Sequence, residues 1–399
     1  MTKRRVAIVG AGQAGLSVAM NLRQKGFEGA VALIGDEAMP PYQRPPLSKA
    51  FLLGKLDHDR VLLKPRAFYE EQRIDLRLCA RVEALDLPGR ELVLPDGRVS
   101  FDDLVLATGT APRRLTREMG GDLEGVFYLR TAADAERLGP ELVEGRRLVM
   151  IGGGYIGLEV AAVARERGLD VTVIEAAARI LQRVAAPETS DYFRDLHERR
   201  GVRVIEGVGL RTLRGERRVS GAELADGRVI DADIVVVGIG VVPRTRLAAQ
   251  AGLALENGIR VDKSGRTSVN GVWAVGDCCS FPYQGQTIRL ESVPHAVDQG
   301  AILAENILGG DAEYRARPWF WSDQYNVKLQ TAGLNSGYDQ TFLRRADSSD
   351  SASVWYFRNG RTIAVDAMND ARTYMAARKW LQQDQAPGFM EVTAAGFRP

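Results

Sequence analysis

The chain has 399 residues, with 53 basic and 51 acidic side chains, a formal charge of +2 and 45% hydrophobic residues. At roughly 100–200 residues per domain, this length predicts two to three domains with ample core. The near-neutral charge argues against a nucleic-acid partner, and no apolar window of roughly 18 residues or more predicts a membrane-spanning helix.

The cysteines and histidines are too few and too scattered to build a metal or disulfide site. Cys79, Cys278 and Cys279 form no CxxC or CxxxxC pair, so a disulfide framework, a thiol redox motif and a cysteine-based metal site are poorly supported. We place His58 in a charged loop and His197 on a polar helix, so we expect no metal site. The cysteine pattern predicts a reducing compartment and a cytoplasmic location.

The first motif is a glycine turn between a strand and a helix. Residues 6–9 are a buried-strand pattern, Gly10, Gly12 and Gly15 follow as GxGxxG, and residues 16–25 continue as a helix. Such glycines allow a tight turn, close approach to a pyrophosphate and close packing of helix on sheet. The basic start and apolar run superficially resemble a signal peptide, but we interpret them as part of this binding unit.

An acidic pair follows the next predicted strand. Residues 31–34 form a second apolar run, which ends at Gly35, Asp36 and Glu37. An acidic side chain at this strand end accepts hydrogen bonds from the ribose hydroxyls of adenosine. A lone GxGxxG is weak evidence, but strand, turn, helix, strand and acid occur here in the right order. The sequence therefore predicts a dinucleotide-binding domain.

The same unit recurs 142 residues later. Residues 148–151 are again a β pattern, Gly152 to Gly157 read GGGYIG, residues 158–167 form a helix, and residues 171–174 end at Glu175. The spacing of 23 residues from Gly152 to Glu175 is close to the expected value of about 20. Two such units without a comparable substrate domain predict two dinucleotides that react with each other, a flavin and a nicotinamide.

Glu175 makes a prediction about the coenzyme. A carboxylate at this position binds the free ribose diol and repels a 2′-phosphate, which favours NADH over NADPH. Arg179 and Arg183 lie nearby in sequence and could grip a phosphate, but we favour their assignment to a helix face or to loop contacts. We expect NADH to exceed NADPH in kcat/KM by at least roughly tenfold.

Two further strand ends carry small residues and one polar group. Residues 101–110 close in an ATG turn, and residues 271–277 close in a Gly-Asp pair. Here the sequence resembles the two-dinucleotide-binding flavoprotein reductases, in which the Gly-Asp aspartate binds the ribityl chain of FAD. The resemblance implies an α/β fold of the glutathione reductase kind, with two Rossmann-like domains and the NAD domain inserted into the FAD domain. We expect an FAD domain at 1–112 and 245–318, an NAD domain at 113–244 and a C-terminal α+β domain at 319–399.

Residues 41–49 narrow the resemblance further. They read PYQRPPLSK, whereas most disulfide reductases of this architecture carry a CxxxxC motif in the first helix of the flavin domain. The chain closely resembles the NADH-dependent ferredoxin reductases of the putidaredoxin reductase group, which serve cytochrome P450 and Rieske-type oxygenases. In the more loosely matching C-terminal part we expect strands at 353–357 and 362–365. Further matches lie at 128–131, 237–243, 291–294 and 319–325.

The resemblance implies a pair of charged residues at the flavin. Lys49 is expected near the flavin ring, paired with Glu159 on the helix after the second glycine motif. A lysine ammonium there stabilises negative charge on reduced flavin, and a carboxylate holds the lysine in place. Without the family motif, Glu159 would be assigned to a solvated helix surface. No residue is expected to form a covalent intermediate.

Other FAD contacts are implied by the same resemblance. Arg44 and Arg130 are expected at phosphate or adenosine, Asp277 at the ribityl hydroxyls, and Pro45 beside the ring. The FAD is expected to be bound non-covalently. The full set of FAD contacts is Gly10, Gly12, Gln13, Ala14, Gly15, Asp36, Glu37, Arg44, Pro45, Lys49, Val82, Ala107, Thr108, Gly109, Arg130, Gly276, Asp277, Val293 and Trp321.

Trp321 is expected close to the flavin, although a tryptophan in an apolar run is most often core. Val82 is expected to bind adenine through its backbone, and Val293 to pack near the isoalloxazine. His295 needs no role as a general acid, because hydride passes directly from nicotinamide to flavin. The expected NAD contacts are Gly152, Gly154, Tyr155, Ile156, Gly157, Glu159, Glu175, Gly238, Ile239 and Gly240.

The acceptor implied by this chemistry is a one-electron carrier, because a flavin can divide a hydride into two single-electron transfers. The resemblance points to a 2Fe-2S ferredoxin. Such carriers are commonly acidic, and the chain has 45 arginines against 8 lysines, so we expect weak, salt-sensitive docking. The family implies a monomer or weak dimer.

Two other functions are kept open. The first is a reductase for rubredoxin or for a small molecule, which would be distinguished by the carrier that becomes reduced. The second is a redox-controlled interaction protein similar to apoptosis-inducing factor, which shares the PYxRPPLSK motif. Such a protein would hold reduced flavin in a long-lived charge-transfer complex with NAD and show negligible turnover.

Overall fold

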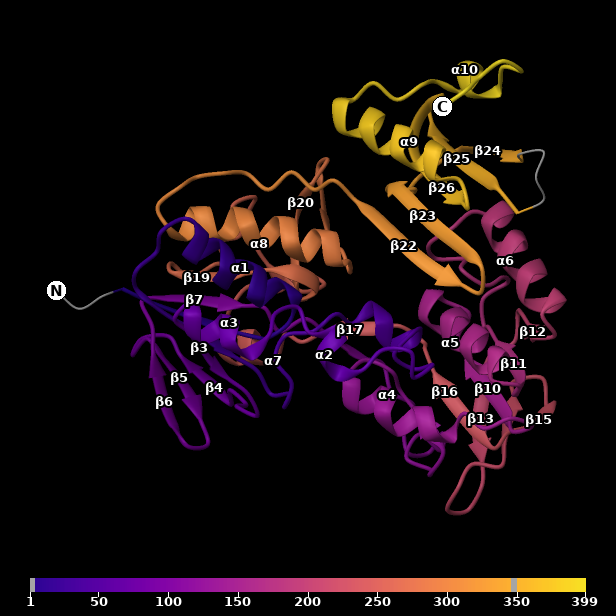
Figure 1. The fold of residues 1–399 in the computed structure, drawn as a ribbon, viewed down its shortest axis with the longest axis horizontal. Helices are drawn as coiled ribbons and strands as arrows, with labels where there is room; N and C mark the ends of the chain where they lie inside the picture. The colour runs from indigo at the N-terminus through magenta and orange to yellow at the C-terminus, as the bar shows by residue number, and fades with distance from the viewer. Residues whose placement is uncertain (1–3, 346–349) are drawn as a thin grey trace. The chain divides into compact units, whose positions relative to one another are not determined.

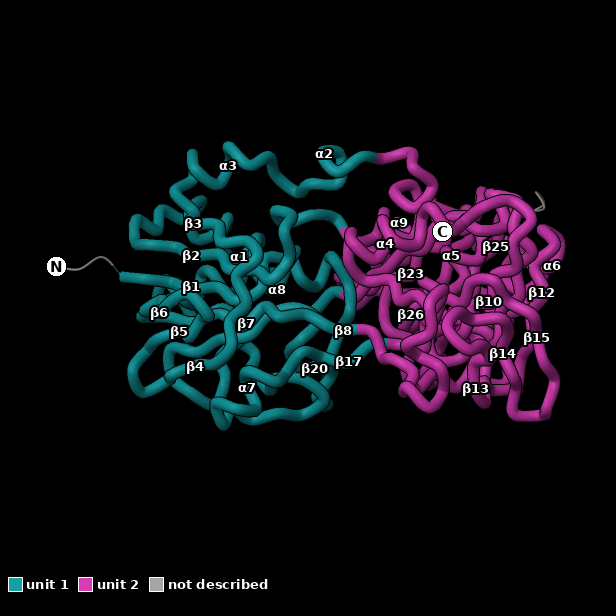
Figure 2. Tube along the Cα trace, turned by 90° about the horizontal axis from the view of Figure 1, so that it is seen from below, with its two compact units in different colours: residues 1–43, 57–111, 241–317 teal, residues 44–56, 112–240, 318–399 magenta. Residues whose placement is uncertain are grey.

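A computed structural model describes residues 4–345 and 350–399. Its internal contacts divide the chain into two compact units, coloured separately in Figure 2. Unit 1 comprises Met1–Gln43, Asp57–Ala111 and Val241–Arg317, and unit 2 comprises Arg44–Leu56, Pro112–Gly240 and Pro318–Pro399. Each unit is therefore built from three separate stretches of the sequence.

Unit 1 is organised around a five-stranded parallel sheet with the order β19-β7-β1-β2-β3. The strands are β1 (Arg5–Val9), β2 (Ala30–Ile34), β3 (Ile74–Arg77), β7 (Asp103–Leu106) and β19 (Val272–Ala274). In β1, Val6 pairs with Val31 of β2 on one side and with Asp103 of β7 on the other. The sheet contains residues that lie up to 269 positions apart in the sequence, because β19 (Val272–Ala274) joins the edge next to β7.

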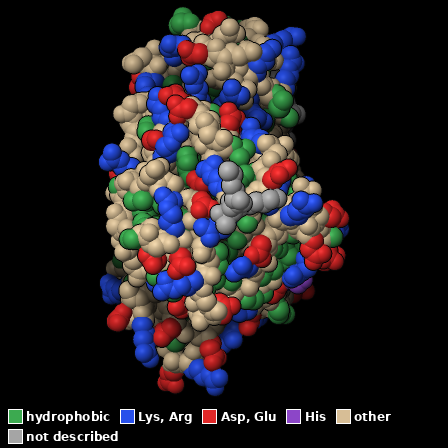
Figure 3. All heavy atoms as spheres, turned by 90° about the vertical axis from the view of Figure 1, so that its left-hand side faces the viewer, with side chains coloured by type: hydrophobic (Ala, Val, Ile, Leu, Met, Phe, Trp, Pro, Cys, Tyr) green, Lys and Arg blue, Asp and Glu red, His purple; other side chains and the backbone are tan. Residues whose placement is uncertain are grey.

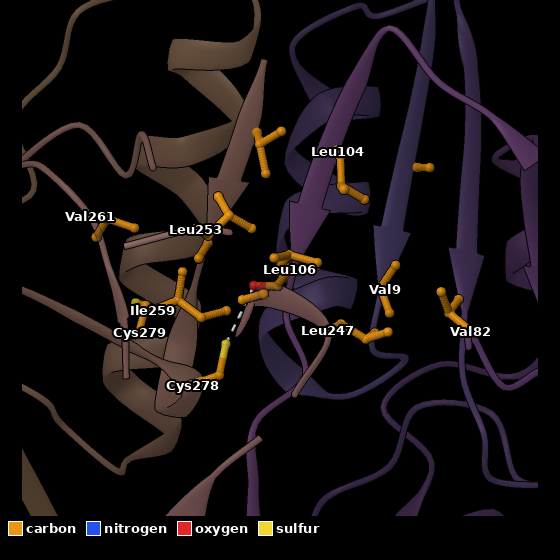
Figure 4. Packing of buried hydrophobic residues seen from close by; sticks show 14 of the residues in the cluster. Val9, Val82, Leu104, Leu106, Leu247, Leu253, Ile259, Val261, Cys278 and Cys279 are labelled. Atoms are coloured by element: carbon orange, nitrogen blue, oxygen red, sulfur yellow. Dashed lines mark hydrogen bonds between the residues drawn. The ribbon is translucent and has the colours of Figure 1, made fainter. Parts of the chain in front are cut away.

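Successive side chains of β1 point to opposite faces of the sheet, and both faces are covered. Val6 and Ile8 pack with α1 (Gln13–Gln24) and α8 (Val293–Ile307), which lie side by side in Figure 1. Ala7 and Val9 belong to the other cluster, shown in Figure 4, where the Cys278 thiol donates to the Leu106 carbonyl. Two-sided burial explains why these strands are almost entirely apolar.

The rest of unit 1 consists of short elements around this sheet. The three-stranded antiparallel sheet β4-β5-β6 contributes Leu92 and Leu94 to the second cluster. Strands β8 (Thr110–Pro112) and β17 (Val241–Pro243) pair where the chain leaves and re-enters unit 1. The remaining elements are α2 (His58–Val61), α3 (Arg66–Glu71), β4 (Ala84–Asp86), β5 (Glu91–Leu94), β6 (Gly97–Ser100), α7 (Arg246–Gln250), β18 (Ile259–Arg260), η3 (Gly276–Cys278), β20 (Cys279–Tyr283) and β21 (Gln286–Ile288).

Unit 2 repeats the same arrangement with a second parallel sheet, of order β12-β11-β10-β16-β9. Its strands are β9 (Val126–Phe127), β10 (Arg147–Ile151), β11 (Asp170–Ile174), β12 (Arg203–Ile205) and β16 (Ile234–Val237). Strand β10 takes the central place of β1, with β11 and β16 as its parallel neighbours. The repeat found in the sequence is therefore a structural repeat. Around this sheet lie η1 (Pro45–Ser48), α4 (Ala132–Leu138), η2 (Gly139–Glu141), α5 (Tyr155–Glu166), α6 (Pro187–Arg199), β13 (Leu210–Arg214), β14 (Gly221–Leu224) and β15 (Val229–Asp231).

The C-terminal part of unit 2 is an antiparallel sheet with the order β22-β23-β26-β25-β24. Trp355 and Phe357 of this sheet pack with Tyr374 of α9 in a separate core. Both strands expected here are present, as β25 and β26. The elements are β22 (Trp319–Gln324), β23 (Val327–Gly333), β24 (Gln340–Arg345), β25 (Ala352–Arg358), β26 (Arg361–Met368), α9 (Ala371–Gln383) and α10 (Phe389–Thr393).

The helices after the glycine turns begin earlier than the sequence predicted. Helix α1 starts at Gln13 rather than Leu16, and α5 starts at Tyr155 rather than Leu158. In both cases the second glycine of the motif, Gly12 or Gly154, is the extended residue that precedes the helix. The third glycine therefore lies inside the first helical turn, where its missing side chain permits close packing on the strand.

Within the described residues, no helix is both long enough and apolar enough to cross a membrane. On the face of the molecule that Figure 3 shows, basic and acidic side chains are interspersed.

Candidate functional site

The first glycine turn is shaped by backbone contacts that no side chain would permit. Gly10 has φ +117°, and a Cβ there would lie 2.1 Å from the carbonyl oxygen of Ala107. A Cβ at Gly15 would lie 2.0 Å from the carbonyl oxygen of Gly10, so the helix sits directly on the end of β1. At Gly12, by contrast, a Cβ would meet nothing within 4 Å. The turn is therefore tight at its first and third glycines and open at its second.

This open position lies at the start of α1. The first helical amides have no partner within the helix, and Gly12 offers no side-chain cap. The helix also carries no acidic residue in its first turn. Unpartnered amides, the positive end of the helix dipole and open space together fit a pyrophosphate group. The residues present thus suit a dinucleotide at this turn.

The other candidate FAD residues of unit 1 gather at the carboxyl ends of the same strands. Ala107, Thr108 and Gly109 follow β7, while Gly276 and Asp277 follow β19. A Cβ at Gly276 would lie 2.8 Å from that of Ala14, which places the Gly-Asp turn beside the glycine turn. In open α/β sheets, ligands bind at this edge.

Hydrogen bonds hold these strand ends in place. Thr108 Oγ1 donates to the Arg244 carbonyl at 2.7 Å, and the Gly276 amide donates to Gln299 Oε1 at 2.8 Å. Arg289 donates to the Asp277 carbonyl at 3.1 Å. Val293 is the first residue of α8. The edge is therefore fixed by contacts from elsewhere in unit 1.

The acidic residues after β2 have partners within unit 1. Tyr42 donates to Glu37 at 2.5 Å, and Arg244 forms an ion pair with Asp36 at 3.3 Å. Glu37 is half-buried, Asp36 is exposed, and Val82 is buried. The structure places both carboxylates directly after β2, at the strand edge where the ribose of a dinucleotide would lie.

The second glycine turn has the same geometry as the first. Gly152 has φ +104°, and its Cβ would lie 2.5 Å from the Gly238 carbonyl oxygen. A Cβ at Gly157 would lie 2.2 Å from the Gly152 carbonyl oxygen, whereas one at Gly154 would meet nothing within 4 Å. The repeat of tight, open and tight positions indicates a second dinucleotide cradle. Ile156 at this turn is 44% exposed.

Glu175 is oriented by two backbone amides at the end of β11. Gly153 donates to one carboxylate oxygen and Ala177 to the other, each at 2.8 Å. These bonds hold the carboxylate beside the glycine turn. Arg179 donates to Ser190, and the Arg183 guanidinium lies beside Gly240, where a Cβ would be 3.4 Å away.

The Lys49–Glu159 ion pair is present inside unit 2. Lys49 Nζ lies 2.7 Å from Glu159 Oε2, and the glutamate is 4% exposed. Ser48 donates to the same carboxylate at 2.5 Å and Ser322 at 2.6 Å. Burial raises the pKa of Glu159, while Lys49 and the two serine hydroxyls act to lower it. The carboxylate is thus buried and surrounded by donors.

The other candidates for FAD in unit 2 are Arg44, Pro45, Arg130 and Trp321. Arg44 donates to the Arg130 carbonyl at 2.8 Å, and Lys49 donates to the Pro45 carbonyl at 3.2 Å. Trp321, on β22, is half-buried and stacks on Trp319 with ring centroids 5.5 Å apart. The residues proposed for FAD are thus divided between the two units.

Sequence reasoning missed several buried polar residues. His197 was placed on a polar helix, which is correct for α6, but its side chain is 0% exposed. Ser322 and Gln324 are also 0% exposed, and neither was singled out. A usable signal was that Ser322 and Gln324 lie two residues apart and follow Phe320 at the same spacing, since residues two apart share one face of a strand.

The chain is similar to known proteins over most of its length. Residues 4–300 match the family model described as pyridine nucleotide-disulphide oxidoreductase, and residues 319–396 match the model described as reductase C-terminal. The chain is 45% identical over 383 residues to a ferredoxin–NAD(P)(+) reductase from Sphingomonas sp., covering 94% of this chain and 92% of the relative.

Two solved structures are similar over nearly the whole chain. The ferredoxin reductase for the CYP199A2 system from Rhodopseudomonas palustris has a TM-score of 0.95 and 40% identity, covering 99% of this chain and 98% of that one. The reductase in a covalent putidaredoxin reductase–putidaredoxin complex has a TM-score of 0.92 and 38% identity, covering 96% of this chain and 94% of that one.

Proposed function

Because the chain belongs to the pyridine nucleotide-disulphide oxidoreductase family, and within it to the NADH-dependent ferredoxin reductases of the putidaredoxin reductase type, we propose that it supplies a 2Fe-2S ferredoxin of an oxygenase system. The oxygenase is of the cytochrome P450 or Rieske type. The enzyme uses non-covalently bound FAD and NADH. The observation that carries the proposal is the pair of matched glycine cradles in one chain, each open only at its second glycine.

The two cradles receive different dinucleotides in this proposal. The turn at Gly10–Gly15, with Asp277 on the neighbouring strand end, binds FAD. The turn at Gly152–Gly157, with Glu175, binds NADH. When bound, FAD supplies the conversion of one hydride into two single electrons. The chain's own residues bind and orient the two dinucleotides and exclude water.

Lys49 and Glu159 tune the flavin in this proposal. Lys49 presents a positive charge to the flavin ring, where it stabilises the negative charge that develops on reduction. Glu159 fixes the ammonium group through the 2.7 Å ion pair. Arg44 and Arg130 contribute to holding FAD, as do Pro45 and Trp321 beside the ring.

Electrons leave the protein rather than passing to an internal thiol pair. Cys278 and Cys279 are buried and Cys79 is exposed, and all three are free thiols. Cys278 and Cys279 are adjacent in the sequence, so they do not form the CxxxxC dithiol that disulfide reductases use. An external one-electron carrier is therefore the acceptor in this proposal. A cytoplasmic location and a monomeric or weakly dimeric state remain predictions.

The three-domain division is also part of the proposal. An FAD domain at 1–112 and 245–318 and an NAD domain at 113–244 each contain one parallel sheet and one glycine cradle. The C-terminal domain at 319–399 contains the antiparallel sheet. The segment Arg44–Leu56 groups with unit 2, so it contributes Lys49 to the side of the molecule that carries Glu159.

The test is an anaerobic reduction by NADH followed by single-turnover transfer to purified 2Fe-2S ferredoxins and rubredoxins. We expect rapid flavin reduction and rapid transfer to at least one ferredoxin. Selective reduction of rubredoxin would identify a rubredoxin reductase instead. A persistent long-wavelength charge-transfer band with negligible turnover would contradict electron transfer and indicate a redox-controlled interaction protein.

Lys49→Met tests the tuning role in the same experiment. The variant should retain FAD but lose at least roughly tenfold in hydride-transfer rate, because the reduced flavin loses a stabilising charge. Lys55→Met is the matched control, since Lys55 lies in the same segment and is exposed. An unchanged stopped-flow rate in Lys49→Met would refute the role.

A further inference from the structure

Strand β22 carries polar side chains into the interior of unit 2. Ser322 and Gln324 are two residues apart, so they lie on the same face of the strand, and both are 0% exposed. This face packs on α5 (Figure 1). There the centroid of the Phe320 ring lies 4.7 Å from that of Tyr155. Buried polar groups are costly without partners, so their hydrogen bonds identify what they do.

The partners form one continuous chain of hydrogen bonds. His197 of α6 lies 2.8 Å from Gln324 Oε1 through its Nε2. Gln324 Nε2 donates to Ser322 Oγ at 3.2 Å, and Ser322 Oγ donates to Glu159 Oε1 at 2.6 Å. The other carboxylate oxygen, Glu159 Oε2, receives Lys49 at 2.7 Å. The chain thus connects α6, β22 and α5 to the lysine.

All donors in this chain point toward Glu159. The amide oxygen of Gln324 can only accept, so His197 carries its proton on Nε2. Burial lowers the pKa of His197 to about 4, so the ring is neutral at pH 7. Its other nitrogen, Nδ1, faces the Tyr325 hydroxyl at 3.5 Å. Each hydrogen bond therefore polarises the next in the same direction, which strengthens the final bond to the carboxylate.

We propose that Ser322, Gln324 and His197 are positioning residues that keep Glu159 ionised and so hold the Lys49 ammonium group in its place at the flavin. The inference rests on the proposed function, because it deepens the role given there to the Lys49–Glu159 pair. Strand β22 would then influence the flavin through two faces. Trp321 lies on one face of the strand, and Ser322 and Gln324 lie on the other. The chain orients charge and transfers no proton, because the Gln324 amide holds its protons.

Among the described residues, a single charged side chain acts on the Glu159 carboxylate. Lys49 is the charged group that acts on it, and Ser48 and Ser322 complete its donors. Tyr155, four residues earlier on α5, feels the charges of Asp366 and Glu159, and burial raises the pKa of that tyrosine well above its ordinary value. Loss of one hydroxyl donor therefore removes a large part of what stabilises the carboxylate.

The first measurement uses the oxidised, FAD-loaded enzyme with ¹³C-labelled glutamate carboxyl groups, and Glu159→Gln assigns the Glu159 signal. In Ser322→Ala and in Gln324→Met, we expect Glu159 to titrate at higher pH than in the wild type, with the larger displacement in Ser322→Ala. Ser353→Ala is the matched control. Ser353 is 2% exposed in the same sheet, and it accepts a hydrogen bond from Trp355 at 3.2 Å instead of contacting Glu159.

The second measurement is the midpoint potential of bound FAD in the same variants. Ser322→Ala should shift the potential in the direction of Lys49→Met, toward more negative values, and slow hydride transfer by roughly tenfold. Ser322→Thr keeps the hydroxyl and should restore both properties. Wild-type Glu159 titration in both Ser322→Ala and Gln324→Met would overturn the inference. A displaced Glu159 titration with an unchanged potential would support the positioning of Glu159 and contradict the flavin-tuning role.

Discussion

At the scale of single residues, the chemistry of Glu159 depends on donors from two distant segments of the chain. Ser48 and Lys49 come from the PPLSK stretch, and Ser322 comes from a strand that begins 160 residues after the glutamate. A helix glutamate in solvent would have none of these contacts. The same principle applies to Glu175, whose carboxylate is fixed by the Gly153 and Ala177 amides.

We expect the preference for NADH over NADPH to depend on Glu175. Glu175→Ala should lower kcat/KM for NADH and narrow the wild-type preference of at least roughly tenfold over NADPH, because the carboxylate that repels a 2′-phosphate is removed. Steady-state kinetics with both coenzymes measure this ratio. A wild-type enzyme with comparable values for the two coenzymes would contradict the assignment of Glu175.

The burial of His197 should make the free energy of unfolding depend on pH. Burial lowers its folded-state pKa to about 4, whereas in the unfolded chain the imidazole protonates near pH 6.5. Below pH 6.5 the unfolded state binds a proton that the folded state does not, so stability falls as the pH falls toward 4. The free energy of unfolding should decrease by about 2 kcal/mol between pH 7 and pH 5 through this group.

Urea unfolding of the wild type and of His197→Gln at both pH values tests this prediction. The variant should lose less stability than the wild type between pH 7 and pH 5. His295 supplies a second group of the same sign, because burial lowers its pKa to about 4 as well. An identical pH dependence in wild type and variant would show that the pKa of His197 is the same in the folded and unfolded states, and would contradict the effect of burial.

At the scale of secondary-structure elements, the two strand–turn–helix units show that glycines of one motif have different tasks. Gly10 and Gly15 allow backbone segments to touch, whereas Gly12 borders open space. Gly152, Gly157 and Gly154 repeat this division. The first and third glycines therefore serve folding, and we expect the second to serve the ligand.

Alanine substitutions should separate these tasks. Gly15→Ala places a Cβ 2.0 Å from a backbone oxygen, so it should destabilise the fold by about 2 kcal/mol or more. Gly12→Ala meets no atom within 4 Å and should leave unfolding nearly unchanged but weaken FAD retention. Urea unfolding and the flavin content of purified protein measure the two effects. Equal FAD retention in Gly12→Ala and wild type would argue against a pyrophosphate at this turn.

At the scale of the whole molecule, the C-terminal sheet is joined to the second parallel-sheet layer by buried hydrogen bonds within unit 2. Tyr356 of β25 donates to Asp366 at 2.5 Å and accepts from the Ala186 amide at 2.9 Å, and Thr189 of α6 donates to Asp366 at 2.9 Å. Asp366 is 0% exposed, and burial raises its pKa. These contacts and the Glu159 chain make the C-terminal sheet part of the same compact unit.

Tyr356→Phe should therefore destabilise the protein by about 2–3 kcal/mol, because it leaves a buried amide unpaired and removes a donor from a buried acid. Tyr192→Phe is the control, since its hydroxyl donates to the Asp350 carbonyl among exposed residues. Urea midpoints of the two variants measure the difference. Equal midpoints would contradict a structural role for the Tyr356 hydroxyl.

Carrier docking is also a property of the whole molecule. If the arginine-rich surface receives an acidic ferredoxin, raising NaCl from about 50 to about 500 mM should slow ferredoxin reduction at least roughly tenfold. Reduction of ferricyanide, which needs no protein docking, should change much less. A ferredoxin rate that is independent of ionic strength would contradict electrostatic docking.

The sequence by itself determined the features that follow local rules. Strand, glycine turn, helix and terminal acid lie within about 30 residues of one another, so two dinucleotide folds could be identified from residues 6–37 and 148–175. The pairing of Lys49 with Glu159 came from a family resemblance, and spacing alone would have left Glu159 on an exposed helix surface. Helix starts were placed three residues late, because the extended glycine rather than the apolar pattern fixes where each helix begins.

Only the tertiary structure decided which polar residues are buried together. His197 lies on a helix of polar composition, and its burial results from contact with Gln324 and Tyr325, more than 120 residues away. Ser322 likewise reaches Glu159 only because β22 packs on α5. Hydrogen bonds between distant segments leave no periodic trace in either segment, whereas a backbone turn that requires glycine leaves its mark in the sequence itself.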